Sequence, residues 1–362
     1  MMSSHRSIGL GVVGSGRMGT HRARLAAAHP GVEYLRVMDI SLEAAERLAK
    51  TTEADAFGDD LAAVIDDPRV DAVIVSLPED THVDAVVAAC ASGRPVMVEK
   101  PLALEMAGGS KMVAEATAAG VDLRVAYSAR FLQKYFVGRD HVHRGQIGQV
   151  VGGWARVYST RAQGLAILRR SVHATPVMDV LTYLVDLVGW YVGEDVVPVE
   201  ALARGHGVVF REHGFDVDDV TSATLTYSDG SVFGFDVCYM LPMGFPTTGQ
   251  SIRFEVFGSE GALLIDDDHR EQILYTEQGH QNAYAGEQEV NLYFLGSQSA
   301  GEWADGRMFG RVAEETRTWL DYLTAGTPCH LSTGKEALVT LAATLAIEEA
   351  SRTGEAVSVE RP

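Results

Sequence analysis

The chain has 362 residues, 46% of them hydrophobic and 22% charged, a globular composition with enough apolar material for two domains of ordinary size. Asp and Glu outnumber Lys and Arg by 49 to 30, so the formal net charge is −19. A chain this acidic, with no run rich in Lys or Arg, is a poor candidate for binding nucleic acid or an anionic membrane surface. Its longest apolar stretches, such as Ala85–Ser92, are too short to span a membrane.

The N-terminus and the cysteines bear on the compartment. Residues 1–13 lead from a short polar tail straight into a strand-like run, without the apolar core and small-residue cleavage site of a secretion signal. Cys90, Cys238 and Cys329 are odd in number and widely spaced, which argues against a disulfide framework and against a clustered metal site. We expect a soluble cytoplasmic protein that binds no metal.

Strands and helices alternate through the first third of the sequence. The predicted elements are a strand at Ile8–Val13, a helix at Arg17–His29, a strand at Tyr34–Met38, a helix from Ser41 to about Lys50, a strand at Ala72–Ser76, a helix at Thr81–Ser92, a strand at Pro95–Glu99, a helix at Glu105–Ala119 and a strand at Asp122–Tyr127. Strands separated by helices predict right-handed crossovers and a parallel sheet covered on both faces. Residues 1–127 are therefore expected to form a doubly wound α/β domain.

Longer strand-like runs dominate the rest of the chain. A helix is predicted at Gln133–Arg144, strands at Gln149–Ser159, Pro198–Gly207, Asp219–Tyr227, Ser231–Tyr239 and Arg253–Phe257, and further helices at Pro176–Val192, Arg311–Ala325 and Lys335–Arg352. Short turns such as Ser228–Ser231 and Gly258–Gly261 favour antiparallel hairpins. Residues 128–362 are therefore expected to form an α+β domain with a large, mostly antiparallel sheet.

A glycine-rich turn joins the first predicted strand to the first predicted helix. Gly14-Ser15-Gly16-Arg17-Met18-Gly19 fits the pattern G-x-G-x-x-G, and its place between a strand and a helix is that of a dinucleotide-binding loop. Gly14 permits the tight turn, Gly16 lets the backbone approach a pyrophosphate, and Gly19 lets helix and strand pack closely. The amides and the partial positive charge of the helix N-terminus would bind the phosphates.

An acidic residue follows at the end of the second predicted strand. Asp39 lies twenty residues after Gly19, where a carboxylate can bind both hydroxyls of a ribose. The carboxylate would repel a 2′-phosphate, and the next residue, Ile40, is neither Arg nor Ser. The sequence therefore predicts that NAD is preferred over NADP.

The predicted strand Pro95–Glu99 leads into Val98-Glu99-Lys100-Pro101-Leu102-Ala103. A Lys-Pro pair at the carboxyl end of a parallel strand lies where ligands of doubly wound folds bind. Here the chain resembles the glucose–fructose oxidoreductase / inositol dehydrogenase (Gfo/Idh/MocA) family, whose mark is Glu-Lys-Pro in that place. Other stretches are also similar to the family, so that the resemblance spans essentially the whole chain: Ser76-Leu77-Pro78 with His82, Tyr127–Phe131, Gly145–Gly148, Glu255–Ile265 and Thr333–Val359.

The resemblance implies a nicotinamide-dependent oxidoreductase with a Rossmann domain and a sheet-based second domain. In the family the open sheet often serves in subunit contacts, so we expect a homodimer or homotetramer. The cofactor site is assigned to the glycine-rich turn, Asp39 and Ile40. The resemblance adds further cofactor contacts: Ser76, Leu77, Pro78, His82, Glu99, Lys100 and Arg130.

Oxidation of an alcohol requires a base for the hydroxyl proton and a group that stabilises the developing alkoxide. The ammonium of Lys100 can do the second. On the predicted helix Pro176–Val192, Asp179, Tyr183 and Asp186 share one face in otherwise apolar surroundings. The family has Asp-x-x-x-His-x-x-Asp here, with His as the usual acid–base residue, so the chain departs from it at Tyr183.

This departure leaves three readings of the proton transfer. A phenol has a pKa of about 10, which is too high for an unaided base at neutral pH. A Lys100 cation nearby would lower that pKa. A neutral phenol is also a good acid in the reductive direction. We assign catalysis to Lys100, Asp179 and Tyr183. Alternatively, Tyr183 only packs and hydrogen-bonds, or His173 in the preceding loop carries the proton.

The substrate site is assigned to Lys100, Arg130, Tyr158, His173, Asp179 and Tyr183. For Arg130 the alternative is a structural ion pair. Arg161, Arg169 and Arg170 either recognise an anionic substrate group or belong to a solvated loop. Four aromatic residues either form a ring-stacking wall or belong to the core of the sheet: Trp154, Tyr158, Tyr239 and Phe245.

The sequence thus predicts NAD-dependent oxidoreduction of a secondary hydroxyl on a small polyhydroxylated or cyclic compound, such as a sugar, an inositol, a sugar acid or a cyclic diol. Two alternatives remain. One is an elimination or isomerisation in which NAD stays bound and is recycled. The other is a non-catalytic NAD-binding regulatory protein, suggested by the missing His. Release of reduced cofactor in step with product would distinguish the dehydrogenase from an enzyme that recycles bound NAD.

Overall fold

The computed structural model describes residues 6–246, 249–268, 270–282, 285–298 and 300–362, so most of the N-terminal tail considered above lies outside the described residues. The chain forms two compact units. Unit 1 comprises the chain up to Phe131 together with Trp303–Leu341, and unit 2 comprises Leu132–Glu302 together with Ala342–Pro362. This division differs from the expected 1–127 and 128–362, because a segment near the C-terminus returns to complete the first unit.

Unit 1 is built on a seven-stranded sheet in the order β17-β6-β5-β4-β1-β2-β3. All neighbouring strands are parallel except β17 and β6. Strands β1, β4 and β5 are buried along their whole length, as expected of a sheet covered on both faces. The strands are β1 (Ile8–Val13), β2 (Val32–Met38), β3 (Ala56–Gly58), β4 (Ala72–Val75), β5 (Val96–Glu99), β6 (Leu123–Ala126) and β17 (Ser332–Thr333).

The helices of unit 1 follow the predicted alternation, so the doubly wound parallel fold is confirmed. Ser41 caps its helix by accepting from the amide of Ala44 at 3.3 Å, and Gly120 ends another with a φ of 66°. Strand β3 and helix α3 were not predicted, because they are only 3 and 5 residues long. The helices are α1 (Arg17–Ala27), α2 (Leu42–Thr52), α3 (Leu61–Ile65), α4 (His82–Ala91), α5 (Met106–Ala119) and α10 (Arg311–Ala325), with short 3-10 turns η1 (Glu79–Thr81) and η2 (Ser128–Phe131).

The strand order of this sheet reverses between β1 and β4. At such a switch point the loops that follow the two central strands diverge, and ligands bind in the crevice at their carboxyl ends. The two loops start side by side here, since the amide of Ser76 donates to the carbonyl of Val13 at 2.8 Å. The glycine-rich turn begins at the next residue after Val13, so the fold puts it where a nucleotide is expected.

The returning C-terminal segment is part of the core of unit 1. Trp319 and Leu320 of α10 belong to the same buried cluster as Val12 of β1 and Ala23 of α1. Trp319 and Leu320 are both fully buried. Burying a large apolar side chain stabilises a fold by roughly 1.5–3 kcal/mol, so the two side chains together contribute several kcal/mol. The first unit is therefore incomplete without residues from the end of the chain.

Unit 2 is built on a second seven-stranded sheet in the order β12-β11-β7-β10-β9-β8-β18. The pair β7 and β10 is parallel and the other described pairs are antiparallel, which confirms a mostly antiparallel sheet. Its strands are β7 (Val150–Thr160), β8 (Pro198–His206), β9 (Val220–Tyr227), β10 (Val232–Leu241), β11 (Gln250–Gly258), β12 (Ala262–Asp267) and β18 (Val357–Ser358).

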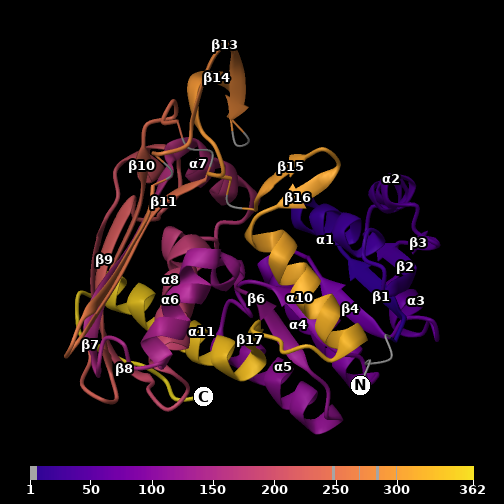
Figure 1. Ribbon diagram of the computed structural model, residues 1–362, viewed down its shortest axis with the longest axis horizontal. Coiled ribbons are helices and arrows are strands. Elements are labelled where there is room, and N and C mark those ends of the chain that lie inside the picture. The colour runs from indigo at the N-terminus through magenta and orange to yellow at the C-terminus, as the bar shows by residue number, and fades with distance from the viewer. Residues whose placement is uncertain (1–5, 247–248, 269, 283–284, 299) are drawn as a thin grey trace. The chain divides into compact units, whose positions relative to one another are not determined.

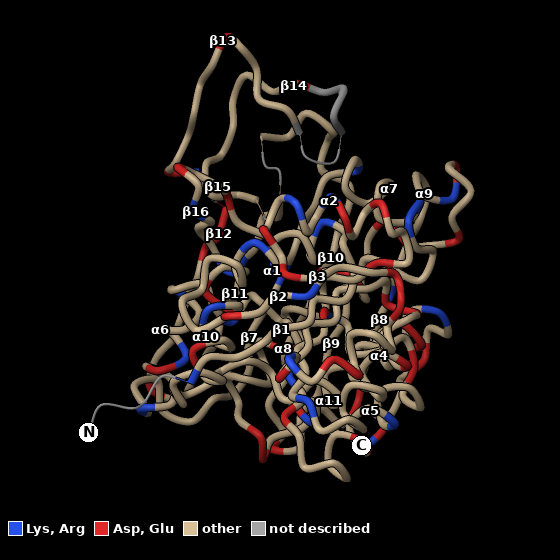
Figure 2. The backbone as a smooth tube through the Cα atoms, turned by 90° about the vertical axis from the view of Figure 1, so that its right-hand side faces the viewer, with Lys and Arg blue, Asp and Glu red and all other residues tan. Residues whose placement is uncertain are grey.

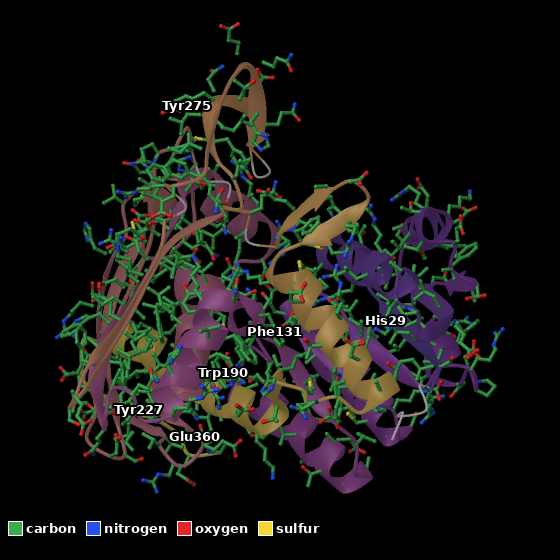
Figure 3. All side chains as sticks on the ribbon, in the orientation of Figure 1. His29, Phe131, Trp190, Tyr227, Tyr275 and Glu360 are labelled. Atoms are coloured by element: carbon green, nitrogen blue, oxygen red, sulfur yellow. The ribbon has the colours of Figure 1, made fainter. Side chains whose placement is uncertain are left out.

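Helices cover one face of this sheet (Figure 1). Helices α6 and α8 meet through Trp190, which is labelled in Figure 3. Its ring lies 5.7 Å from that of Phe136 and 4.6 Å from the guanidinium of Arg139. The helical elements are α6 (Gln133–His143), α7 (Arg161–Arg170), the π-helical turn η3 (Val177–Leu181), α8 (Thr182–Val192), α9 (Val209–Glu212) and α11 (Gly334–Thr353), the last of which belongs to unit 2 from Ala342 onward.

The opposite face of the sheet carries exposed apolar side chains. Trp154 of β7 is 60% exposed and Leu264 of β12 is 64% exposed, and both are in register with Glu255 of β11, so they lie in one row. Trp154 was expected to belong either to a substrate wall or to the sheet core. Its exposure excludes the core, because its ring lies over Gly234 on the open face.

Two small hairpins complete the described structure. Strands β13 (Ile273–Asn282) and β14 (Ala285–Phe294) pair with each other, and Tyr275 on them is 72% exposed (Figure 3). Strands β15 (Glu302–Ala304) and β16 (Arg307–Phe309) form the other hairpin, where Trp303 stacks on Arg24 at 3.5 Å.

Charged residues of both signs are interspersed along the backbone (Figure 2), which agrees with the absence of a basic run in the sequence. Among the residues that the structure describes, no helix is both long enough and apolar enough to cross a membrane.

Candidate active site

The glycine-rich turn of unit 1 leaves room for a ligand at one position and packs tightly at the other two. A Cβ on Gly14, whose φ is +102°, would lie 2.3 Å from the carbonyl oxygen of Ser76, and one on Gly19 would lie 1.8 Å from that of Gly14. A Cβ on Gly16 would meet nothing within 4 Å. Gly14 and Gly19 are thus needed for the fold, whereas Gly16 opens the backbone toward the place that a pyrophosphate would take.

Two buried hydroxyls at the switch point also fit a cofactor. In the described part of the chain, the side-chain oxygens of Ser15 and Ser76 are buried and have no hydrogen-bond partner. Buried polar atoms are nearly always paired, so unpaired ones at a ligand-binding edge indicate groups that a ligand satisfies. Arg17 and Met18 follow in the first turn of α1, whose amides point at the same place. The residues present therefore fit a dinucleotide.

Asp39 lies at the end of β2 and faces the turn. One carboxylate oxygen accepts from the amide of Ser15 at 2.7 Å and the other from the amide of Ser41 at 2.9 Å. Each oxygen keeps a second lone pair for a ribose hydroxyl. The neighbouring Ile40 is 87% exposed and offers no cation to a 2′-phosphate. This arrangement fits a ribose that carries no 2′-phosphate.

Lys100 follows the last residue of β5, at the same edge of the sheet. The preceding Glu99 is buried, and the bond between Lys100 and Pro101 is a cis peptide. The ring of His82 is fully buried, with Nδ1 3.1 Å from the carbonyl oxygen of Pro101 and Nε2 3.0 Å from that of Leu77. His82 therefore ties the exit of β4, residues 76–78, to the exit of β5.

Arg130 lies in η2 and is 2% exposed. Its guanidinium donates to the carboxylate of Glu336 at 3.1 Å, which is the ion pair that the sequence left open as an alternative. Burial by itself would raise the pKa of Glu336, but Arg130 and the amide of Thr333 outweigh it and hold the pKa below its usual value. Glu336 is therefore an anion that orients Arg130.

In unit 2, Asp179 lies within the π-helical turn η3 rather than in a regular helix. The predicted helix over 176–192 assumed one period throughout, but a π turn inserts an extra residue just before Tyr183 and re-aims Asp179. Asp179 is 8% exposed and accepts a 2.5 Å hydrogen bond from the hydroxyl of Tyr239 on β10. Asp186, one turn beyond Tyr183, is 1% exposed.

The loop before η3 is anchored to α11. The hydroxyl of Thr175 accepts from the amide of Met178 at 3.1 Å and donates to the carboxylate of Glu348. Burial raises the pKa of Glu348, while this hydrogen bond and the charge of His173 oppose the rise. The side chain of His173 is exposed, so it remains available for the role considered for it.

The other predicted substrate residues of unit 2 lie on β7 and α7. Tyr158 is half-buried, with the guanidinium of Arg156 4.4 Å from its ring. The solvated loop considered for Arg161–Arg170 is wrong, because these residues form helix α7, capped by the hydroxyl of Thr160 on the amide of Gln163. Tyr239 was considered only for a ring-stacking wall or the core of the sheet, but its hydroxyl donates a hydrogen bond to Asp179. The two residues are 60 positions apart, so no local pattern in the sequence indicates this contact.

No group of three or more His, Cys, Asp or Glu side chains among the described residues could hold a metal ion.

Comparison with known proteins agrees with this picture. Residues 8–127 match the Gfo/Idh/MocA profile, described as an oxidoreductase family with an NAD-binding Rossmann fold, and residues 138–264 match the GFO/IDH/MocA C-terminal domain. The scyllo-inositol 2-dehydrogenase (NAD(+)) of Bacillus subtilis is 27% identical over 256 residues, which is 70% of this chain and 72% of that protein. The myo-inositol 2-dehydrogenase of Thermotoga maritima is 27% identical over 277 residues, 76% of this chain and 80% of that protein.

Among solved structures, GenD2 from gentamicin A biosynthesis in complex with NAD has the same fold, with a TM-score of 0.81 at 23% identity over 99% of this chain and 98% of that one. The two profile matches together cover more than half of the sequence. The chain therefore belongs to the Gfo/Idh/MocA family of oxidoreductases, with an NAD-binding Rossmann fold at its N-terminal end.

Proposed function

We propose that the protein is an NAD-dependent dehydrogenase that oxidises a secondary hydroxyl of an inositol, a sugar or a related small polyol and reduces the corresponding carbonyl. The observation that carries the proposal is the position of Lys100 in unit 1. It follows β5, next to β4 and the switch point, on the sheet edge where the glycine turn and the hydroxyls of Ser15 and Ser76 fit a dinucleotide. Relatives named as inositol dehydrogenases support the substrate class.

The proposed roles follow from the chemistry of an alcohol oxidation. NAD, when bound, supplies the acceptor for the hydride. Lys100 binds the reacting oxygen and stabilises the alkoxide that develops on it. Tyr183 exchanges the hydroxyl proton, and Asp179 binds a neighbouring hydroxyl of the substrate or orients Tyr183. Asp39 selects the unphosphorylated ribose and thereby NAD over NADP.

Tyr183 in place of the usual His shifts the proposed proton transfer toward higher pH. A phenol with a pKa near about 10 is mostly protonated at neutral pH, so it is the better acid for the reductive direction. We therefore propose that oxidation accelerates with rising pH well above neutrality, while carbonyl reduction is favoured near neutral pH.

The test is a screen at the absorbance band of reduced nicotinamide. The purified protein is mixed with NAD or NADP and with a panel containing scyllo-inositol, myo-inositol, aldoses, sugar acids and cyclic diols. Reduction of NAD by any member supports the proposal and names the substrate group. Binding of NAD without reduction on the whole panel, at neutral and alkaline pH, would contradict it and favour internal recycling of the cofactor or a regulatory role.

We also propose that the open face of the second sheet joins subunits into a homodimer or homotetramer, since it exposes the row of Trp154 and Leu264. Scattered exposed apolar residues are ordinary, but a row on an uncovered sheet indicates a contact surface. The described cysteines are free thiols, which supports the cytoplasm as the compartment.

A further inference from the structure

A buried cluster of charges lies behind the strand end that carries Lys100. It consists of Arg22 on α1, Glu99 at the end of β5, and Glu315 and Thr316 on α10. Arg22, Glu315 and Thr316 are fully buried, and Glu99 is 9% exposed. Neither Arg22 nor Glu315 is part of the sequence motifs that identify the family, and the two are 293 residues apart.

Arg22 uses its whole guanidinium in this cluster. Nε and Nη2 both lie 2.9 Å from one carboxylate oxygen of Glu99. Nη2 also donates to Glu315 at 2.5 Å, and Nη1 donates to the hydroxyl of Thr316 at 2.6 Å. A planar fork can hold three partners in fixed directions, which the single ammonium of a lysine cannot do. The cluster therefore fixes the side chain of Glu99 against two helices.

Glu315 is the least well satisfied member of the cluster. Arg22 makes the printed hydrogen bonds to both carboxylates, the charge of buried Arg311 also acts on Glu315, and the second oxygen of Glu315 is buried with no hydrogen-bond partner among the described residues. Burial raises the pKa of Glu315 to about 7, with the charge of Glu99 adding to the rise and the charges of Arg22 and Arg311 opposing it. Apolar residues of similar volume would often stabilise a fold as well or better than such a buried network. Its presence beside Lys100 therefore points to a role other than stability.

The backbone on both sides of Lys100 is held. On one side Glu99 is held through its carboxylate by Arg22, and on the other Pro101 is held through its carbonyl oxygen by His82 at 3.1 Å. The cluster contacts Glu99, the residue directly before Lys100. It acts on the direction in which the backbone presents the Lys100 side chain.

We propose that Arg22 and Glu315 are positioning residues for the dehydrogenase reaction: they fix Glu99 and thereby set the backbone from which Lys100 reaches the reacting oxygen. The inference rests on the role proposed above for Lys100. An ammonium displaced by about 1 Å from the developing alkoxide is expected to lower turnover by about a hundredfold, because positioning is worth that much in a preorganised site.

The first experiment needs no substrate. Arg22→Met removes the hydrogen bonds to two buried carboxylates and can unfold the protein, so the triple variant Arg22→Met/Glu99→Gln/Glu315→Gln, which removes the three charges together, is made beside it. The matched control is Arg36→Met, which breaks the pair with buried Asp67 in the same unit at 3.1 Å. Hydrogen exchange is then followed by mass spectrometry in peptides spanning 99–103 and in β2.

In the triple variant we expect amide exchange over 99–103 to be at least tenfold faster than in the wild type. Amide exchange in β2 should be the same in both proteins. The Arg36→Met control should leave 99–103 unchanged. Equal exchange over 99–103 in the triple variant and the wild type would overturn the proposal, and so would a uniform acceleration throughout unit 1, since that is loss of stability alone.

The second experiment separates this inference from the proposed function. With the panel polyol that gives the highest rate, the triple variant should lower kcat at least thirtyfold and raise the isotope effect for substrate deuterated at the reacting carbon. Wild-type kcat in the triple variant, with Lys100→Met inactive, would overturn the positioning role alone. Wild-type kcat in Lys100→Met would overturn the proposed function instead. Faster amide exchange over 99–103 in the triple variant would then still show that the cluster restrains the backbone around Lys100.

Discussion

The hydroxyl of Tyr239 donates a 2.5 Å hydrogen bond to the carboxylate of Asp179. Tyr239 comes from β10 and Asp179 from the π-helical turn, and their exposures are 1% and 8%. A carboxylate this deeply buried needs a donor, because an unpaired charge in such a place costs several kcal/mol. The sheet of unit 2 thus fixes the acid that precedes Tyr183 by one helical turn.

Removing this hydrogen bond tests whether the orientation of Asp179 matters for the reaction. Tyr239→Phe should lower kcat about tenfold, since a hydrogen bond to a charged group contributes about 1.5–3 kcal/mol, part of which affects only stability. NAD affinity, measured by quenching of tryptophan fluorescence, should not change. The control is Tyr191→Phe, which removes a 2.6 Å hydrogen bond to a backbone carbonyl in the same unit and should lower the melting temperature but not kcat.

The identity of the acid–base group is tested at Tyr183. Tyr183→Phe should lower turnover about a hundredfold or more with NAD binding intact, because the phenolic proton is lost. Tyr183→His should keep much of the activity and move the alkaline inflection of the kcat–pH profile toward about 6.5, the ordinary pKa of imidazole. Full activity in the Phe variant would remove Tyr183 from the mechanism and direct attention to His173.

Cofactor preference is tested at the end of β2. In Asp39→Ala/Ile40→Arg the ratio of kcat/KM for NADP to that for NAD should rise at least about a hundredfold, because a cation replaces a repelling carboxylate beside the 2′-position. Asp60→Asn is the control, since Asp60 also accepts from a backbone amide, at 2.9 Å, but at the start of α3. An unchanged ratio in the double variant would exclude Asp39 as the selector.

The buried Glu315 predicts a pH dependence of stability. Its pKa is 4.5 in the unfolded chain and about 7 in the fold, so folding binds a proton between these values. The stabilisation from the protonated carboxyl is complete below 4.5 and is lost as the pH rises through 7. Relative to the wild type, Glu315→Gln should therefore gain up to about 3 kcal/mol in free energy of unfolding between pH 5 and 8.

Urea unfolding of both proteins at several pH values between those limits measures this difference. Glu314→Gln is the neighbouring control: its carboxylate is exposed and pairs with Arg317, so the difference from wild type should be nearly independent of pH. A pH-independent difference for Glu315→Gln as well would mean that its carboxyl is ionised throughout.

Subunit contacts are tested on the open sheet face. Trp154→Glu/Leu264→Glu places two charges in the exposed row and should lower the molar mass measured by light scattering to that of a smaller assembly or the monomer. Tyr275→Glu, at an equally exposed position on the β13–β14 hairpin, should leave the mass unchanged. An unchanged mass in the double variant would remove this face from the interface.

The elements that carry local signals were predictable from the sequence. The glycine turn with Asp39, and the strand end with Lys100, are marked by short-range patterns whose physical reasons lie within a few residues. The π turn was not, because the residues around Asp179 also fit an ordinary helix. Helix α7 was not predicted either, because its arginines also fit a solvated loop.

Contacts between distant segments could not be predicted either. Arg22 reads as an ordinary basic residue of an amphipathic helix, and only the fold shows that it is fully buried against Glu315 on α10. The same holds for Tyr239 and Asp179. A single sequence gives the period of each element but not the pairing between elements, so buried polar networks are the part of a site that it leaves undetermined.

The return of Trp303–Leu341 to unit 1 has a consequence for the order in which the protein is made. The glycine-rich turn leaves the ribosome early, but Trp319, Leu320 and the pairing of β17 with β6 arrive only after unit 2 has been almost fully synthesised. Until then, part of the apolar core of the nascent Rossmann domain is exposed to solvent. Such a state favours chaperone binding and slows folding. A chain released before Leu341 would have every residue proposed to bind the cofactor and still lack part of the domain that holds them.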